Sequence, residues 1–499
     1  MTKFKLCSAA LVAVAMLGCS DNDTTDHSNG NISQAYQGLW QASGYGSVIQ
    51  INDESYTEYK FSSGYCFTDK HENITNDKLE KLITLSEDQQ SFALLEGYGS
   101  QAFSAPKKQY DKVTTLPDSC IQNLIPVAGE GDYVPDASRD LTVFYQLFKE
   151  YYFSFDSKNV DFDALYYDVF SLVTADTEEE TLLEYMAYMT SPLEDSLIQI
   201  ISTYGEDYYT SSNRPYIVSE LISEYASLNN LPFPIPDELI NEALIQDIED
   251  YISAMLDLQW EIVADYAESE EDISIAADGL IRWFQNEGIG YLYIGAMTGF
   301  AEEQESDIET ASLALANLDS IMDQALNDLS DTDGLIIDIR TNTGGNDYIS
   351  LALASRFVEQ ANTHVYSKQA RDGDNVTPLI DVSISPRGNT LYHSPIVLLT
   401  SANTVSAAEV FALSMKQLPN VTLVGGTTQG AFSDMLEFTL PSGIEIALSN
   451  EFYFSPQYEW MEFTGVAPDY EVEFFTQQQR FEERDSGIEK AIGIILESD

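Results

Sequence analysis

The feature that most constrains the fold is a series of continuous apolar runs that alternate with helical patterns in the C-terminal half. Runs such as "GLIIDI" (334–339), "PIVLLT" (395–400) and "VTLVGG" (421–426) carry apolar residues at successive positions. A strand of this kind is buried on both faces. Between the runs, apolar residues recur three and four positions apart, which is typical of amphipathic helices. The pattern predicts an α/β fold in which helices cover a largely parallel sheet.

The rest of the chain divides into stretches of different pattern. Residues 36–125 contain short runs rich in β-forming residues between Gly, Asn and Asp, which predicts a small β module. Residues 126–290 show mostly helical spacing. The expected organisation is a signal segment (1–19), a flexible tether (20–35), the β module (36–125), a helical region (126–290), the α/β core (291–475) and a C-terminal helix (476–499).

The first residues resemble a bacterial lipoprotein signal. Lys3 and Lys5 precede an apolar stretch, 6–17, that is too short to span a bilayer and leads into "AMLGC". We expect Cys19 to be the lipidated first residue of the mature chain, and Ser20 after it points to the outer membrane. An ordinary secretory signal is the alternative. Both interpretations place the protein outside the cytoplasm.

The cysteine count is consistent with an oxidising compartment. When Cys7 leaves with the signal and Cys19 carries lipid, Cys66 and Cys120 remain. This pair can form one disulfide within the β module. The chain has no CxxC pair and no Cys/His cluster, so we expect no metal and no cofactor.

The charge of the chain excludes one class of partner. Its 82 acidic side chains against 23 basic ones give a formal net charge of −59. Such a surface repels phosphate groups, so nucleic acid is not an expected partner. The acidic residues form no long block, which indicates a solvated surface and not an acidic binding tail.

Two motifs follow neighbouring strands of the predicted sheet. "TNTGGN" carries Gly344 and Gly345, and "TVSAAE" places Ser406 on the first turn of a helix with the Ala407 N–H beside it. Taken separately, a tight turn and a helix cap explain these residues. Because the carboxyl ends of parallel strands meet at one sheet edge, we expect the two motifs to lie together. A nucleophile beside oxyanion donors is what acyl transfer needs.

Further motifs give these residues a family resemblance. The stretches "GLIIDIRTNTGGND", "SPIVLLTSANTVSAAEVFA", "VTLVGGTTQGA" and "EFTGVAPDYEV" occur in that order. Together they resemble the tail-specific, or C-terminal-processing, serine peptidase family, and "SPLEDSLIQI" is similar to the helical lead-in of its tricorn-like branch. The resemblance covers residues 137–475 and implies a Clp-protease/crotonase-like core. It also implies that Ser406 is the nucleophile and that Ala407 and the Gly344–Gly345 turn form the oxyanion hole.

The chain departs from this family at the general base. One branch carries a lysine after "LVG", but "GGTTQGAFS" contains none. In the tricorn-like branch the base is a histidine supported by a serine and a glutamate. Ser196 and Glu462 match the serine and the glutamate, whereas Leu197 occupies the histidine position. Leucine cannot accept a proton from a serine hydroxyl.

The other basic side chains are not expected to replace that histidine. Strand rise places His393 roughly 23 Å from the nucleophile end of its strand. Helix rise alone places Lys416 about 15 Å from Ser406. His364 is expected at the far end of the sheet, His27 lies in the tether, and His71 reaches the site only if the β module folds over it.

We therefore expect a serine peptidase that hydrolyses polypeptides in the cell envelope. Ser406 would attack the peptide bond, and Ala407 and Gly345 would hold the oxyanion. Glu462 with Ser196 would orient or polarise the reacting groups. The alternative is a catalytically inactive homologue that binds peptides or envelope proteins. A third interpretation, a structural lipoprotein, leaves the Gly-Gly turn beside a strand-end serine unexplained.

Overall fold

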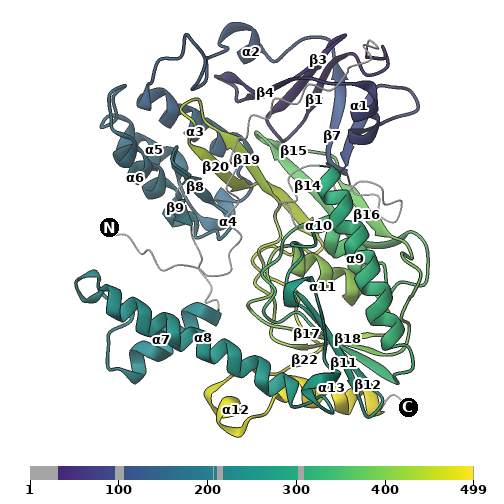
Figure 1. Ribbon diagram of the computed structural model, residues 1–499. Helices are drawn as coiled ribbons and strands as arrows, with labels where there is room; N and C mark the ends of the chain where they lie inside the picture. Colours follow the sequence, from purple (N-terminus) through teal and green to yellow (C-terminus); the bar gives the residue numbers. More distant parts are fainter. Residues whose placement is uncertain (1–31, 96–105, 206, 211–216, 302–307, 498–499) are drawn as a thin grey trace, which may run out of the picture.

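The computed structural model describes residues 32–95, 106–205, 207–210, 217–301 and 308–497. The predicted signal segment, Cys19 and most of the tether lie outside these residues. The β module lies at the top of Figure 1, the helices that follow it lie at the upper left, and the α/β core lies below them on the right. Among the described residues, no helix combines the length and the apolar character needed to cross a membrane.

The β module is a seven-stranded sheet in the order β4-β3-β2-β1-β7-β6-β5. Its core contains Trp40 and Phe92, whose ring centroids lie 5.0 Å apart. The same hydrophobic cluster continues into α3, so the module packs onto the rest of the chain. Its elements are β1 (Gly38–Ala42), β2 (Ser47–Ile51), β3 (Ser55–Phe61), β4 (Cys66–Asn73), α1 (Asn76–Leu82), β5 (Ile83–Leu85), β6 (Ser91–Leu95), β7 (Pro106–Val113) and α2 (Asp118–Gln122).

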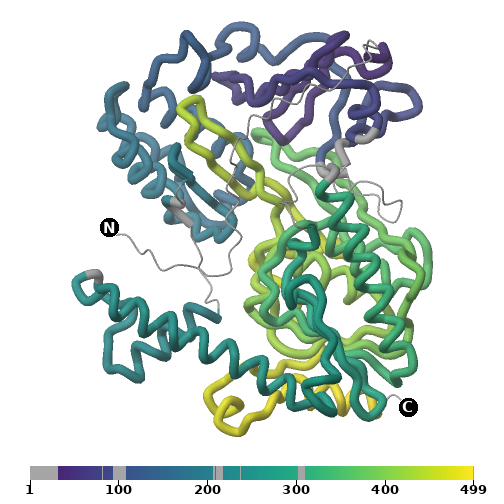
Figure 2. The backbone as a smooth tube through the Cα atoms, viewed as in Figure 1, coloured from purple at the N-terminus to yellow at the C-terminus, as the bar shows by residue number. Residues whose placement is uncertain are grey.

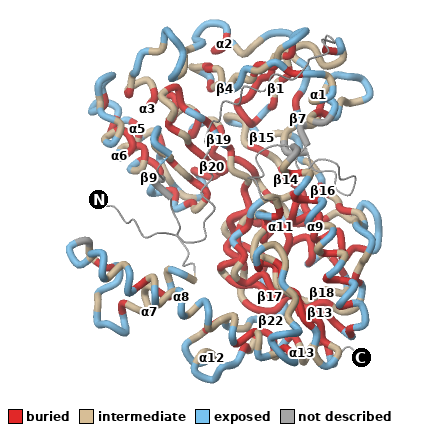
Figure 3. The backbone as a smooth tube through the Cα atoms, in the orientation of Figure 1, coloured by how far each residue is buried: buried red, intermediate tan, exposed pale blue. Residues whose placement is uncertain are grey.

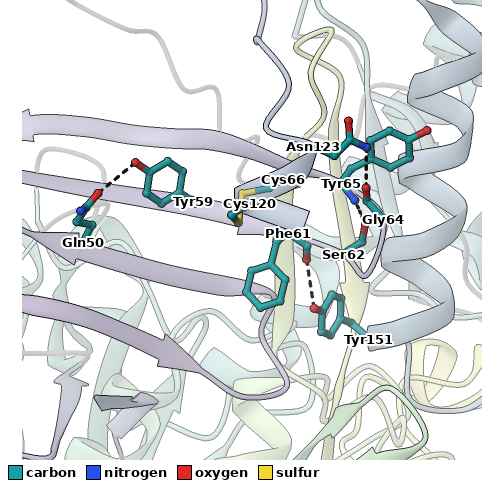
Figure 4. Close-up of a disulfide and its surroundings, with 10 residues drawn as sticks. All are labelled: Gln50, Tyr59, Phe61, Ser62, Gly64, Tyr65, Cys66, Cys120, Asn123 and Tyr151. Atoms are coloured by element: carbon teal, nitrogen blue, oxygen red, sulfur yellow. Dashed lines mark hydrogen bonds between the residues drawn. A yellow bond between two sulfur atoms is a disulfide. The ribbon is translucent and has the colours of Figure 1, made fainter. Parts of the chain in front are cut away.

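A disulfide joins Cys66 on β4 to Cys120 on α2, as the cysteine count predicts (Figure 4). Main-chain hydrogen bonds run beside it. The N–H of Cys66 donates to the carbonyl of Asn123 at 3.2 Å, and the N–H of Ile125 donates to the carbonyl of Cys66 at 2.8 Å. The segment around α2 is therefore fastened to the sheet by both covalent and hydrogen bonds.

Residues 126–290 contain the expected helices, two short strands and, from residue 274, strands of the core sheet, so the α/β core begins earlier than the expected 291. Strands β8 and β9 join the hairpin β19–β20 in a four-stranded sheet of order β19-β20-β8-β9, and Figure 2 shows this yellow-green hairpin running beside the blue helical region. Three- and four-residue strands are too short to show a period in the sequence. The elements are α3 (Ala137–Tyr151), α4 (Phe155–Lys158), α5 (Phe162–Phe170), α6 (Glu179–Thr190), β8 (Gln199–Ile201), β9 (Asp207–Thr210), α7 (Ile217–Leu228), α8 (Glu242–Ala264), β19 (Met435–Thr439) and β20 (Glu445–Ser449).

The core is a seven-stranded sheet in the order β10-β11-β12-β13-β17-β18-β22. Its strands run parallel from β12 to β22, and β10 and β11 add an antiparallel edge. This confirms the predicted α/β class. The strands are β10 (Ser274–Ala276), β11 (Ile281–Asn286), β12 (Ile289–Ile294), β13 (Gly334–Asp338), β17 (Ile396–Thr400), β18 (Val421–Gly425) and β22 (Tyr470–Glu471).

Helices cover both faces of this sheet, which explains the continuous apolar runs. Alternate residues of β17, such as Ile396 and Leu398, pack with the helices of one face, and Val397 and Leu399 pack with α13 on the other. Buried positions accordingly concentrate along β13, β17 and β18 in Figure 3. The covering helices are α9 (Ile308–Asp328), α10 (Asp347–Ala354) and α11 (Ala407–Lys416) on the first face and α13 (Ser486–Glu497) on the second.

Two further parts complete the fold. A small sheet of β14, β15, β16 and β21 packs near α11 and connects the core to the β module, because Asn450 Nδ2 donates to the carbonyl of Gly44 at 3.0 Å. Helices α7 and α8 form an arm with its own small hydrophobic cluster. The remaining elements are β14 (Thr363–Asp372), β15 (Asn375–Val376), β16 (Ile380–Ile384), β21 (Glu451–Phe454) and α12 (Gln477–Glu482).

Candidate active site

Ser406 lies at the carboxyl edge of the core sheet, between β17 and α11. The loop that leads to it is bonded to the end of the neighbouring strand β13. Ser401 Oγ donates to the carbonyl of Arg340 at 2.6 Å, and Thr404 Oγ1 donates to the carbonyl of Ile339 at 3.0 Å. The N–H of Val405 donates to the carbonyl of Asn342 at 3.1 Å. These bonds fix the position of the residue before Ser406.

The backbone of Ser406 is in a strained conformation, with φ 56° and ψ −126°. A helix-capping serine ordinarily has extended dihedral angles. A non-glycine residue in a sparsely populated region costs roughly 1–3 kcal/mol and persists only where its surroundings enforce it. A sharp, strained turn from strand to helix is also how nucleophilic serines are exposed in α/β-hydrolases. Ser406 starts the helix and forms a capping box with Glu409, but its dihedral angles are not those of an ordinary cap.

The Gly344–Gly345 turn lies against Ser406, as the two motifs predict. A Cβ atom on Gly344 would stand 2.9 Å from Ser406 Cβ and 3.1 Å from the nitrogen of Ala407. A Cβ atom on Gly345 would stand 2.5 Å from the carbonyl of Met297. The turn is thus held between Met297, which follows β12, and residues 401–406, here called the nucleophile loop. Only glycine fits at either position.

Two main-chain donors beside Ser406 are free for a ligand. The carbonyl of Gly344 accepts from Met297 N–H at 2.8 Å, and Gly344 N–H donates to Asn342 Oδ1 at 2.9 Å. Within the described parts of the chain, the N–H groups of Gly345 and Ala407 have no hydrogen-bond partner. Ala407 is buried in the first turn of α11, where amides lack partners within the helix, and Gly345 is exposed. Two such free amides beside one hydroxyl fit the requirement for an oxyanion site.

Glu409, which the sequence reading did not assign, holds the nucleophile loop together. Its carboxylate accepts hydrogen bonds from the N–H groups of Ser406 (3.1 Å), Gly430 (2.6 Å) and Ala431 (2.8 Å), and from Thr428 Oγ1 (2.5 Å). Burial raises the pKa of Glu409 to about 7, although these donors favour the charged form. The Ser-x-x-Glu spacing of a capping box was the sequence signal that could have identified it.

Leu197 lies beside the nucleophile. It packs with Val405 and Ala431, and Met435 packs against the same cluster. Val405 directly precedes Ser406, and the carbonyl of Ala431 accepts the Ser406 N–H at 3.1 Å. The position that matches the histidine of the tricorn-like branch is therefore next to the nucleophile loop and is occupied by an apolar side chain.

Ser196 and Glu462 both support the segment 429–433. Ser196 Oγ accepts from Gln429 Nε2 at 3.1 Å. Glu462 Oε2 accepts from the N–H groups of Phe432 (2.9 Å) and Ser433 (3.0 Å). The pKa of Glu462 is raised well above its usual range, first by burial and then by the nearby carboxylate of Asp195. In the described residues neither side chain forms a hydrogen bond with the Ser406 hydroxyl. Both contact the neighbouring segment 429–433.

The histidines and Lys416 are engaged elsewhere. His71 Nδ1 is 2.7 Å from Thr57 Oγ1 in the β module. His364 Nε2 is 3.0 Å from Ser367 Oγ on β14. His393 Nδ1 is 3.9 Å from a carboxylate oxygen of Glu359. Lys416 Nζ donates to the carbonyl of Ala467 at 2.6 Å, and His27 lies outside the described residues.

Comparison with known proteins confirms the family resemblance. Residues 288–472 match the model of peptidase family S41. The chain is 26% identical over 175 residues to carboxyl-terminal-processing peptidase 3 of Arabidopsis thaliana, covering 35% of this chain and 30% of that protein. It is 30% identical over 141 residues to the carboxyl-terminal-processing protease of a Synechocystis strain, covering 28% of this chain and 31% of that protein. The chain thus spans about a third of the length of these relatives.

Solved structures are similar in fold. A candidate peptidase of Parabacteroides merdae superposes with a TM-score of 0.52 and 23% identity, covering 72% of this chain and 97% of that one. This similarity supports the peptidase-type α/β core with its preceding helical region.

Proposed function

Because residues 288–472 match the model of peptidase family S41, we propose that the chain is a serine-type peptidase of the tail-specific type that acts on polypeptides. The observation that carries the proposal is the strained turn at Ser406, with the free N–H groups of Ala407 and Gly345 beside it. A protein that used Ser406 only as a helix cap would have no need of this strain.

In this proposal Ser406 Oγ attacks the carbonyl carbon of a peptide bond. The carbonyl oxygen becomes negative and accepts hydrogen bonds from Ala407 and Gly345 N–H, which stabilise the tetrahedral intermediate. Glu409 fixes the position of Ser406 relative to the segment 428–431 through its four hydrogen bonds. Glu462 and Ser196 position the continuation of that segment.

No described side chain is placed to accept the proton of the Ser406 hydroxyl, so in this proposal the proton passes to water and the leaving amine takes its proton from water. Leu197 and Ala431 line the place where a base would be expected. Removal of a base from such a site leaves the part of the catalysis that comes from the oxyanion hole and from binding. We therefore expect slow turnover compared with enzymes that have a complete set of catalytic groups.

The apolar cluster around Leu197 favours a second candidate function, in which the site binds polypeptide without cleaving it. The same amides would then hold a carbonyl group of a bound peptide. Both candidates predict peptide binding, and only the first predicts a reaction at Ser406.

Labelling with a fluorophosphonate separates the two candidates. The reagent forms a covalent bond to an attacking serine, so mass spectrometry of the folded protein should find the adduct on the peptide that contains Ser406. Ser406→Ala and heat-unfolded protein are the controls and should show no adduct. Absence of labelling in folded protein that still binds peptides would leave the binding function alone.

We also propose that the protein is attached to the cell envelope through lipid at Cys19, since the residues before it have the pattern of a lipoprotein signal. Metabolic labelling with a fatty-acid analogue should mark the full-length protein, and Cys19→Ser should abolish the label. A Cys19→Ser protein that stays labelled and membrane-bound would contradict lipidation at this residue.

A further inference from the structure

A cavity of about 340 Å³ lies between α7 and the segment that follows β22. Its lining includes Ile217, Leu221, Phe474 and Phe475 as apolar walls. Ligand pockets in proteins span roughly 300–1,000 Å³, so this cavity suits a single side chain better than a large ligand. In Figure 1 the teal arm of α7 and α8 lies above the yellow helix α12, from which other lining residues come.

The cavity adjoins the nucleophile loop through two separate contacts. The N–H of Ile217, at the start of α7, donates to Asn403 Oδ1, and Asn403 is three residues before Ser406. The ring of Phe474 lies 4.4 Å from the guanidinium of Arg340. The carbonyl of Arg340 in turn accepts the Ser401 hydroxyl at 2.6 Å. The wall of the cavity therefore packs against the loop that carries Ser406.

The charges at the cavity are unbalanced. Among the described residues of its lining Arg480 is the one cation, and both terminal oxygens of Glu224 accept from its Nη2 at 2.5 Å. Arg480 Nη1 donates to the carbonyl of Phe475 at 2.5 Å. Glu220 and Glu473 also line the cavity, and neither takes part in an ion pair or hydrogen bond of its carboxylate within the described chain. Partial burial raises the pKa of Glu220, as expected for a carboxylate without a cation.

The chemistry of the lining selects one kind of occupant. Apolar and aromatic walls bury the methylene groups of a lysine or arginine side chain, while its charged end stays near carboxylates. An acidic side chain would meet two unpaired carboxylates, and a purely apolar one would leave both of them without a partner. The net charge of −59 attracts basic segments in general.

We propose that this cavity is a specificity subsite for a lysine or arginine side chain of the bound polypeptide, with Glu220 and Glu473 facing the cation. The inference rests on the proposed function only in requiring that polypeptide binds across Ser406. It holds for a cleaving and for a binding-only protein alike. It adds a preference for basic residues at one fixed distance from the bond held at Ser406.

Peptide binding to the Ser406→Ala protein tests the proposal without cleavage. Fluorescein-labelled peptides of one length carry a lysine at each position in turn, in an otherwise constant neutral sequence, and norleucine at the same positions gives the uncharged reference. Fluorescence anisotropy at fixed ionic strength gives each Kd. We expect lysine at one position to bind about threefold to tenfold more tightly than norleucine, in keeping with partly exposed ion pairs.

The double variant Glu220→Gln/Glu473→Gln should remove this advantage. A matched variant, Glu268→Gln/Glu271→Gln, removes the same charge from exposed residues outside the cavity and should retain it. An advantage that persists in the first variant, or that disappears equally in both, would overturn the subsite. Equal binding of all peptides would overturn the subsite and leave the proposed function standing, whereas no binding of any peptide would contradict both.

Discussion

At the scale of single residues, the conformation of Ser406 is the main result that the sequence could not supply. The pattern "TVSAAE" after a buried strand is enough to place a serine at the sheet edge, but it does not separate a cap from a nucleophile. The distinction lies in a φ of 56° and in the contact with Gly344. Both depend on the packing of two loops that are distant in sequence.

Gly344 gives the sharpest residue-level prediction. Gly344→Ala adds a Cβ 2.8 Å from the carbonyl of Val405 at a φ of +103°, so the turn must move away from Ser406. We expect fluorophosphonate labelling to fall at least tenfold and the free energy of unfolding to drop by about 1–3 kcal/mol. Gly129→Ala is the control, because its φ is +96° and nothing lies within 4 Å of the added atom. Labelling of Gly344→Ala at the unaltered rate would show that the turn is not part of the site.

Glu409 makes the stability depend on pH. Its pKa is raised from 4.5 to about 7 in the folded protein. A carboxyl group with a raised pKa binds its proton more tightly when folded, so its contribution is complete below pH 4.5 and is lost as the pH rises through about 7. Between pH 4.5 and about 7 the unfolding free energy of the unaltered protein should therefore decrease as the pH rises. Glu409→Gln should make this slope shallower by up to about 1.4 kcal/mol per pH unit.

Chemical denaturation at several pH values measures this slope. Glu437→Gln, at an exposed position of β19, is the matched control and should keep the slope of the unaltered protein. An identical pH dependence in the Glu409→Gln variant would mean that Glu409 does not titrate in this range. The role of Glu409 was missed in the sequence because its partners, Thr428 to Ala431, lie on another loop.

At the scale of elements, the long periodic segments were predictable and the short ones were not. The strands of the parallel sheet have continuous apolar runs because helices cover both faces, and that pattern is visible without a structure. Strands β8 and β9 lie within a stretch expected to be helical. Their existence depends on pairing with β20, which comes more than two hundred residues later in the chain. Tertiary pairing of this kind leaves no local period.

The disulfide gives a prediction for the β module. Cross-linking Cys66 and Cys120 restricts the unfolded chain, and the double variant Cys66→Ser/Cys120→Ser should lose about 2–4 kcal/mol of unfolding free energy. Labelling at Ser406 should be unchanged at temperatures where the variant is folded. Reactive thiols in the native, unreduced protein would contradict the presence of the bond.

At the scale of the whole molecule, the chain combines a peptidase-type core with parts that contact it at a distance from Ser406. Tyr45 of the β module donates to Glu451, which also accepts from Lys368 Nζ at 3.0 Å. This buried group connects the module to the small sheet beside α11. The arm of α7 and α8 contacts the nucleophile loop directly through Asn403. Neither contact was foreseeable from the sequence, because each joins segments that lie far apart in the chain.

The site itself was predictable to the extent that its residues occur in motifs. Ser406, Ala407 and the glycine turn come together as expected, and Leu197 lies beside them. Ser196 and Glu462 contact the segment 429–433 and do not contact the Ser406 hydroxyl within the described residues. We therefore propose as the central claim that the site is arranged for attack by Ser406 and lacks only a proton acceptor.

The rate of phosphonylation of Leu197→His between pH 5 and 9 tests this claim most directly. A histidine beside Val405 would accept the Ser406 proton, so the second-order rate constant should rise at least about 100-fold, the lower range for general-base catalysis. The increase should appear above a pH near 6.5, where a histidine loses its proton. Leu197→Gln, which adds a polar group without a base, should react as slowly as the unaltered protein. A folded Leu197→His protein that reacts no faster than Leu197→Gln would contradict the account.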